Sequence, residues 1–150
     1  MRQNLCLLAG SLLAASSTLA GAAAASDAQL VSEATGGRLT ALKGQYYEES
    51  CSAAQDYDAE VVDLNQDGQP EVFTQIHGIC LGGGAGVLLE LYIKGRDGQW
   101  HGQFGFPGMY NVLTTKHQGY PDIEIGGPGT CFPVWRWNGQ SYALHKPCPL

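Results

Sequence analysis

From Ala59 onward, the chain consists of short runs of alternating apolar and polar residues, separated by breaks rich in glycine, asparagine and aspartate. Apolar residues at every second position are typical of β-strands with one buried face. The run from Val87 to Lys94 is strongly apolar and is predicted to be a central strand. The other predicted strands are Glu60–Leu64, Val72–Ile76, Gln99–Phe106, Tyr110–Lys116, Asp122–Ile125, Phe132–Trp137 and Ser141–Lys146.

Two of the breaks between these runs contain residues that favour hairpin turns. Asp97-Gly98 and Asn138-Gly139 are dipeptides that readily adopt the positive φ angles of tight hairpin turns. Short strands, regular turns and 21 glycines predict an all-β domain. We expect mostly antiparallel hairpins that form a small propeller-like sheet or a sandwich, stapled by disulfides and carrying a calcium loop.

The predicted core comes from the apolar positions of these strands. We expect it to contain Val62, Val72, Ile76, Leu89, Leu91, Ile93, Phe104, Val112, Ile123, Ile125, Val134, Trp137, Tyr142 and Leu144. Upstream of Ala59 the pattern is weaker. Residues 26–37 are polar and predicted to be loose or a short helix, and residues 38–49 carry both helical and extended signals.

The first 25 residues differ from the rest in character. Arg2 precedes a largely apolar run that ends in small residues, Leu19 to Ala25. A basic start, an apolar middle and a small-residue end are typical of a secretory signal peptide. A membrane-spanning helix is the alternative, but the run consists mostly of Ala, Ser and Gly. We therefore expect cleavage near Ala25, a single domain over residues 26–150, and a periplasmic or secreted location.

Four cysteines, Cys51, Cys80, Cys131 and Cys148, follow this segment. An even number of cysteines in an exported protein predicts two disulfides. Four cysteines allow three connectivities. We favour Cys51 with Cys80 and Cys131 with Cys148, because each pair brackets a predicted hairpin. A zinc site is disfavoured because no two cysteines have the close spacing of zinc ribbons.

Charge is distributed unevenly along the chain. The whole chain has a net charge of −6, and removing Arg2 with the first 25 residues leaves −7. Residues 44–93 contain no Lys or Arg, although several Asp and Glu residues lie there. Such a surface attracts basic proteins and repels nucleic acid. We expect a basic protein partner or a bound cation to offset this charge.

Residues 63–71, Asp-Leu-Asn-Gln-Asp-Gly-Gln-Pro-Glu, are the clearest candidate site. Side-chain oxygens at alternate positions converge on one point when the backbone curls, and Gly68 permits the sharp turn. Calcium takes six to eight oxygen ligands and fits this arrangement. We expect side-chain oxygens from Asp63, Asn65 and Asp67, the backbone carbonyl of Gln69, and the carboxylate of Glu71. The alternative is a polar turn without a metal.

The loop is not an EF-hand, because Thr74 occupies the twelfth position, where an EF-hand has glutamate. It resembles the calcium loops of FG-GAP and VCBS repeat proteins, whose pattern is Asp-x-Asn-x-Asp-Gly-x-x-Asp/Glu. The match covers about ten residues. The resemblance implies a structural calcium ion and, as one function, an extracellular adhesion or surface module that binds a glycan or a receptor.

The whole mature chain also resembles a set of small exported bacterial domains. They share a cysteine before the acidic loop, a glycine-rich segment beginning at a cysteine, and an ending like Val134 to Tyr142. Some of them resemble periplasmic immunity proteins and lysozyme inhibitors. This resemblance implies an inhibitor of a lysozyme-like cell-wall hydrolase. The Ser-Gly-x-x-Tyr loop of those inhibitors is absent, and Asn138 to Tyr142 is the nearest segment.

Other candidate sites are weaker. The loop Gly82–Gly86 lacks the Lys-Ser/Thr ending of a phosphate loop, so we expect a connector or a close backbone approach. The four histidines are scattered, and we predict no enzyme. Asp56, Asp58 and Glu60 alternate and would share one face of a strand, where they either extend the cation site or contact solvent.

Overall fold

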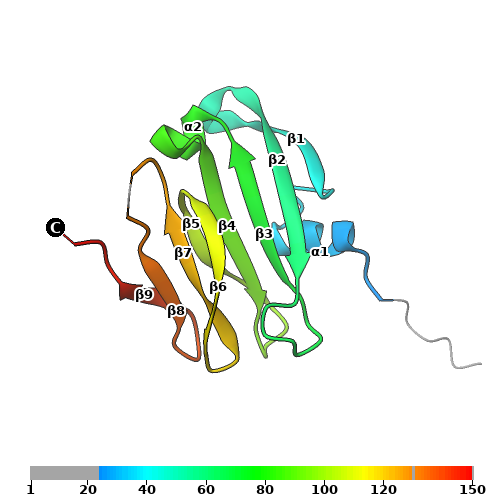
Figure 1. The fold of residues 1–150 in the computed structure, drawn as a ribbon. Coiled ribbons are helices and arrows are strands. Elements are labelled where there is room, and N and C mark those ends of the chain that lie inside the picture. Colours follow the sequence, from blue (N-terminus) through cyan, green and yellow to red (C-terminus); the bar gives the residue numbers. More distant parts are fainter. Residues whose placement is uncertain (1–23, 130, 150) are drawn as a thin grey trace, which may run out of the picture.

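The computed structural model describes residues 24–129 and 131–149, so residues 1–23 of the predicted signal peptide, which spans residues 1–25, lie outside them. Within the described residues the fold is mostly antiparallel β-structure in two sheets (Figure 1). No helix in this part of the chain is long and apolar enough to cross a membrane.

The first sheet has the strand order β1-β2-β3-β4-β5, so each strand pairs with its neighbours in sequence. The second has the order β6-β7-β8-β9. All observed pairings are antiparallel. The strands are β1 (Lys43–Glu48), β2 (Ala53–Val62), β3 (Glu71–His77), β4 (Val87–Lys94), β5 (Trp100–Pro107), β6 (Met109–His117), β7 (Tyr120–Gly126), β8 (Val134–Trp137) and β9 (Tyr142–Lys146).

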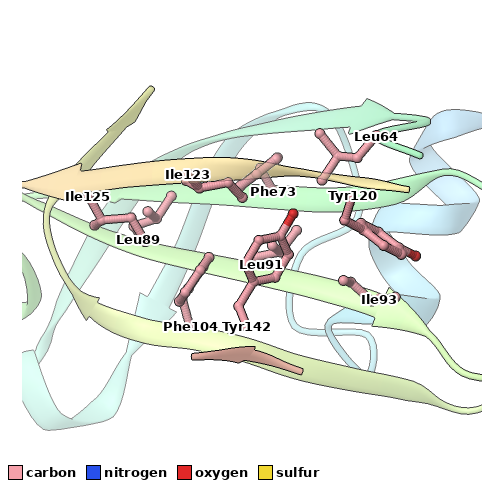
Figure 2. Close-up of a cluster of buried hydrophobic side chains, with 10 residues drawn as sticks. All are labelled: Leu64, Phe73, Leu89, Leu91, Ile93, Phe104, Tyr120, Ile123, Ile125 and Tyr142. Carbon is pink, nitrogen blue, oxygen red and sulfur yellow. The ribbon is translucent and has the colours of Figure 1, made fainter. Parts of the chain in front are cut away.

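The two sheets pack against each other across a common core. Figure 2 shows Phe73, Leu89 and Leu91 of the first sheet facing Ile123 and Ile125 of the second. Sheets that bury alternate residues against one another form a sandwich. The predicted all-β antiparallel class is therefore confirmed. The propeller-like arrangement is not confirmed, because neither of the described sheets closes on itself.

A second core lies on the opposite face of the first sheet. Helix α1 (Asp27–Ala34) begins with a capping box formed by Ser26 and Gln29, which satisfies backbone N–H groups at its start. Val31 of α1 packs with Leu39, Tyr57, Val72 and Ile76. The segment 26–37 therefore contains a short helix, and the ambiguous segment 38–49 contains the extended strand β1.

Most of the predicted core positions are buried, but four are not. Val62 and Trp137 are half-buried and pack against the first core. Val112 and Leu144 are exposed, so their prediction as core residues was wrong. They lie on β6 and β9, which are the two edge strands of the second sheet. At a sheet edge, an inward-facing side chain can extend past the opposing sheet and remain in water.

Both predicted disulfides form. Cys51 bonds Cys80 and Cys131 bonds Cys148. The first joins the short 3-10 turn η1 (Glu49–Cys51) to helix α2 (Ile79–Gly82), and the second brackets the β8–β9 hairpin. Cross-links of this kind reduce the entropy of the unfolded chain.

The glycine-rich loop after β3 is made of two short turns, α2 and η2 (Gly83–Ala85). A Cβ placed on Gly82 would lie 2.1 Å from the backbone nitrogen of Val87, so no larger residue fits there without a shift. The structure thus favours the close-backbone-approach explanation at this position.

Candidate metal site

The acidic loop connects β2 to β3 at one end of the first sheet (Figure 1). It turns sharply, with positive φ angles of 63° at Gln66 and 87° at Gly68. Glycine adopts such angles without a steric penalty, which explains the Asp67-Gly68 step. The curled backbone that the sequence predicts is therefore present.

Asp63 holds the turn together through its carboxylate. Its Oδ1 accepts a hydrogen bond from the backbone nitrogen of Asp67 at 3.1 Å, and its Oδ2 accepts one from Gly68 at 2.8 Å. The Asn65 side-chain oxygen also accepts from the nitrogen of Asp67, at 3.1 Å. Each of these oxygens has a second acceptor position. These oxygens can therefore coordinate a cation while they also hold the turn.

The Asp67 carboxylate accepts hydrogen bonds from two other candidate ligand residues, Asn65 and Gln69. The Asn65 amide donates to its Oδ2 at 2.8 Å, and the backbone nitrogen of Gln69 donates to its Oδ1 at 2.8 Å. The structure thus brings Asp63, Asn65 and Asp67 together in one hydrogen-bonded turn. The side chain of Gln69 instead donates to the carbonyl of Lys94 at 2.9 Å, which ties the loop to β4.

Glu71 is placed differently from the rest of the set. Its side chain is 2% exposed, and its oxygens accept hydrogen bonds from the backbone nitrogen of Leu64 at 2.7 Å and from the Tyr120 hydroxyl at 3.0 Å. Burial raises the pKa of Glu71 to about 7, opposed by those two hydrogen bonds and reinforced by the charges of Asp67 and Asp63. Negative charge is therefore concentrated around this loop.

The donor set fits calcium in chemistry, since every candidate ligand supplies oxygen. Across residues 24–129 and 131–149, however, no group of three or more His, Cys, Asp or Glu side chains is gathered closely enough to hold a metal ion. Unlike the Asp63 and Asp67 carboxylates, the Glu71 carboxylate points into the core, toward Leu64 and Tyr120. Asp63, Asn65, Asp67 and the Gln69 carbonyl would hold the ion, and Glu71 would need to contribute from its buried position.

Asp56, Asp58 and Glu60 have other partners. Asp58 is paired with Lys43 at 3.2 Å and with His77 at 2.7 Å. Asp56 accepts a hydrogen bond from Gln45, and Glu60 accepts one from Tyr110 at 2.6 Å. These three acids therefore lie on the surface of the first sheet, as the solvent-facing alternative predicts.

Two residues of the site were missed by sequence reasoning. Leu64 is 7% exposed and anchors the acidic loop in the core, and its apolar character within a polar stretch was an available signal. Tyr120 contacts Glu71 across 49 residues of sequence. No local pattern indicates that contact.

No family model, curated protein or solved structure matches this chain.

Proposed function

We propose that this chain is an exported, calcium-stabilised protein-binding domain that inhibits a basic, lysozyme-like cell-wall hydrolase, as a periplasmic immunity protein does. The observation that carries the calcium part is the turn in which Asp63 caps the nitrogens of Asp67 and Gly68 beside Asn65. This turn assembles hard oxygen donors within a few residues, which is the ligand chemistry that calcium prefers.

The ion has a structural role in this proposal. It offsets the charges of Asp63, Asp67 and Glu71, which lie close enough for the first two to raise the pKa of the third. Offsetting like charges stabilises the folded chain, because their repulsion is largest when the loop is curled. We expect an affinity of roughly 10⁻⁶ to 10⁻³ M, the range of calcium sensors and extracellular modules.

Calcium should therefore stabilise the protein. We expect the free energy of unfolding to rise by about 2 kcal/mol when free calcium is about 30 times its Kd, because the ion binds the folded state alone. Thermal melting and isothermal titration calorimetry of residues 26–150 measure the effect. Asp67→Asn should abolish it, and Asp56→Asn, a surface acid bonded to Gln45, is the matched control.

Two results together would exclude calcium binding by this loop. One is the absence of heat on adding millimolar calcium, and the other is melting that is unchanged by EDTA. A response to magnesium equal to that of calcium would instead indicate general charge screening.

The partner part of the proposal rests on the acidic strand β2. Asp56 and Glu60 are exposed and Asp58 is half-exposed, all at alternate positions and thus on one face. Of these three acids, Asp58 is paired with the basic side chain of Lys43 and also contacts His77. An acidic surface of this kind accelerates encounter with a basic protein and makes the complex sensitive to salt.

Inhibition assays on a purified basic lysozyme test this part. We expect stoichiometric loss of cell-wall hydrolysis that weakens as salt is raised, and a further loss of inhibition in Asp56→Lys. Glu124→Lys makes the same charge change on the other sheet and should leave inhibition unchanged. Full hydrolase activity at a molar excess of the domain would contradict the proposal.

A second candidate function is an extracellular adhesion or surface module with an FG-GAP-like calcium loop. One observation favours it, because Asn65, Asp67 and Gln69 line a wide groove at the end of the sandwich. Loops at the rim of a rigid β-scaffold are common binding sites.

A further inference from the structure

Four connecting turns meet at one end of the sandwich. They are the β2–β3 loop, the β4–β5 turn, the β6–β7 turn and the β8–β9 turn, which gather at the bottom of Figure 1. Together they surround a groove of about 1190 Å³. A space of this size accommodates a ligand larger than a single small metabolite.

Two side-chain hydrogen bonds between neighbouring segments hold the rim of the groove. Gln69 bonds to the carbonyl of Lys94 at 2.9 Å, which joins the β2–β3 loop to the end of β4. The backbone nitrogen of Tyr142 donates to the Gln103 side chain at 3.0 Å, which joins β9 to β5. These contacts fix two sides of the groove.

On the other two sides of the groove, glycine-containing turns lie next to each other. A Cβ on Gly139 would lie 2.7 Å from the side-chain oxygen of Gln118, so the β8–β9 turn lies against the β6–β7 turn. A Cβ on Gly119 would lie 3.9 Å from that of Asn65, which places the β6–β7 turn beside the β2–β3 loop. The groove is therefore preformed, which reduces the entropy lost on binding.

The lining is polar and carries no excess of positive charge. Asp67 and Asp97 contribute two carboxylates and Arg96 one cation, while the ammonium of the lining residue Lys94 is paired with Glu33 of α1 at 3.5 Å. A phosphate-rich ligand would need an excess of positive charge, and an acyl chain would need an apolar wall. The lining therefore favours an uncharged, polar ligand.

Two amides in the lining are available for such a ligand. Gln69 and Gln103 use their side chains to hold the rim. Within the described part of the chain, the side-chain amides of Gln118 and Gln140 make no hydrogen bond to a protein group, although both line the groove. Each amide can donate and accept, which matches the hydroxyl groups of a sugar.

An aromatic wall completes the groove. Trp137 is half-buried, lines the groove, and packs on Tyr120 with ring centroids 4.5 Å apart. Tyr120 is also bonded to Glu71, so the wall is fixed from behind. A flat indole held in this way offers an apolar surface to the C–H face of a sugar ring.

We propose that this groove binds an uncharged oligosaccharide, with a sugar ring stacked on Trp137 and hydroxyl groups bonded to the amides of Gln118 and Gln140. The inference rests on the second candidate function, the surface module, and names the ligand class of its groove; it requires neither the protein partner nor the calcium ion of the first. Asn65 and Asp67 line the same groove, so an ion in the loop would stiffen one wall without contacting the sugar in this proposal.

The test is titration of the ¹⁵N-labelled domain, residues 26–150, with cellotetraose, mannotetraose and N-acetylchitotetraose. We expect at least one of them to shift the indole signal of Trp137 and the side-chain signals of Gln118 and Gln140. The double variant Gln118→Ala/Gln140→Ala should bind about tenfold more weakly, because it loses two hydrogen-bonding groups on exposed turns. Gln75→Ala, on β3 and away from the groove, should bind normally.

Trp137→Phe and Trp100→Phe form a second matched pair, because only the first of these tryptophans lines the groove. The proposal is overturned if no tetrasaccharide at about 10 mM shifts the groove signals. It is overturned equally if the shifts map elsewhere or the double glutamine variant binds as well as the parent. Repeating the titration in EDTA separates this result from the calcium proposal, since sugar binding should persist there.

Discussion

Phe73→Ala is expected to lower the free energy of unfolding by about 3–5 kcal/mol, the usual range for removing a buried phenylalanine. Phe73 is 1% exposed and lies on β3 between the two sheets. Its ring stacks on Tyr110 of β6, with centroids 4.2 Å apart and an angle of 10° between the planes. Truncation would leave a cavity at the point where the sheets meet. Urea unfolding followed by circular dichroism measures the loss.

Phe132→Ala is the matched control for this change. Phe132 is 43% exposed, so the same truncation should cost about 1 kcal/mol or less. In the Phe73 variant, Tyr110 is expected to lose its ring stacking while its hydroxyl bond to Glu60 remains. Equal losses in the two phenylalanine variants would show that the sheets do not share this core.

Asp122→Ala should also destabilise the fold strongly, by about 2–3 kcal/mol. Asp122 of β7 is 2% exposed and accepts hydrogen bonds from Arg136 of β8 at 2.8 and 2.7 Å. It also accepts one from Thr115 of β6 at 2.6 Å. The carboxylate thus ties three adjacent strands of the second sheet, and its removal leaves their donors unpaired. Asp122→Asn, which keeps the shape and one acceptor, should lose less.

The pH dependence of the stability of Asp122→Asn gives an independent check on the role of the Asp122 carboxylate. The hydrogen bonds from Arg136, together with that from Thr115, hold the pKa of Asp122 at about 2, below the value near 3.9 of an unfolded aspartate. Because the folded pKa is depressed, the stabilisation is complete above about pH 4 and is lost as the pH falls toward 2. The stability difference between the parent and Asp122→Asn should therefore shrink over that interval. A difference that stays constant from pH 5 to about pH 2 would contradict the role assigned to the ionised carboxylate.

Local sequence patterns predicted much of this fold because they reflect short-range physics. The Asp97-Gly98 and Asn138-Gly139 steps mark turns in the structure, and Val87–Lys94 is the strand β4 as expected. The boundaries were less accurate. β2 begins at Ala53, before the alternation becomes clear at Ala59, because its pairing with β1 extends it.

The candidate site was only partly predictable, because only part of it depends on residues that are close in the chain. Asp63, Asn65 and Asp67 gather in one turn because they are neighbours and Gly68 permits the curl. Glu71 is adjacent in sequence, yet its placement depends on Tyr120, which belongs to the other sheet. Its burial could not be derived from spacing within the loop.

Whereas the structure decided among the three possible disulfide connectivities, the sequence by itself determined most of the strands, the turns and the oxygen-rich residues of the curled loop. These features depend on backbone sterics and on residues close in the chain. The tertiary structure alone decided that β6 and β9 are edge strands, which leaves Val112 and Leu144 exposed. It also decided that α1 covers a second core and that four turns meet around one groove. Those outcomes depend on strand order and on contacts between distant segments, which alternation along the chain does not encode.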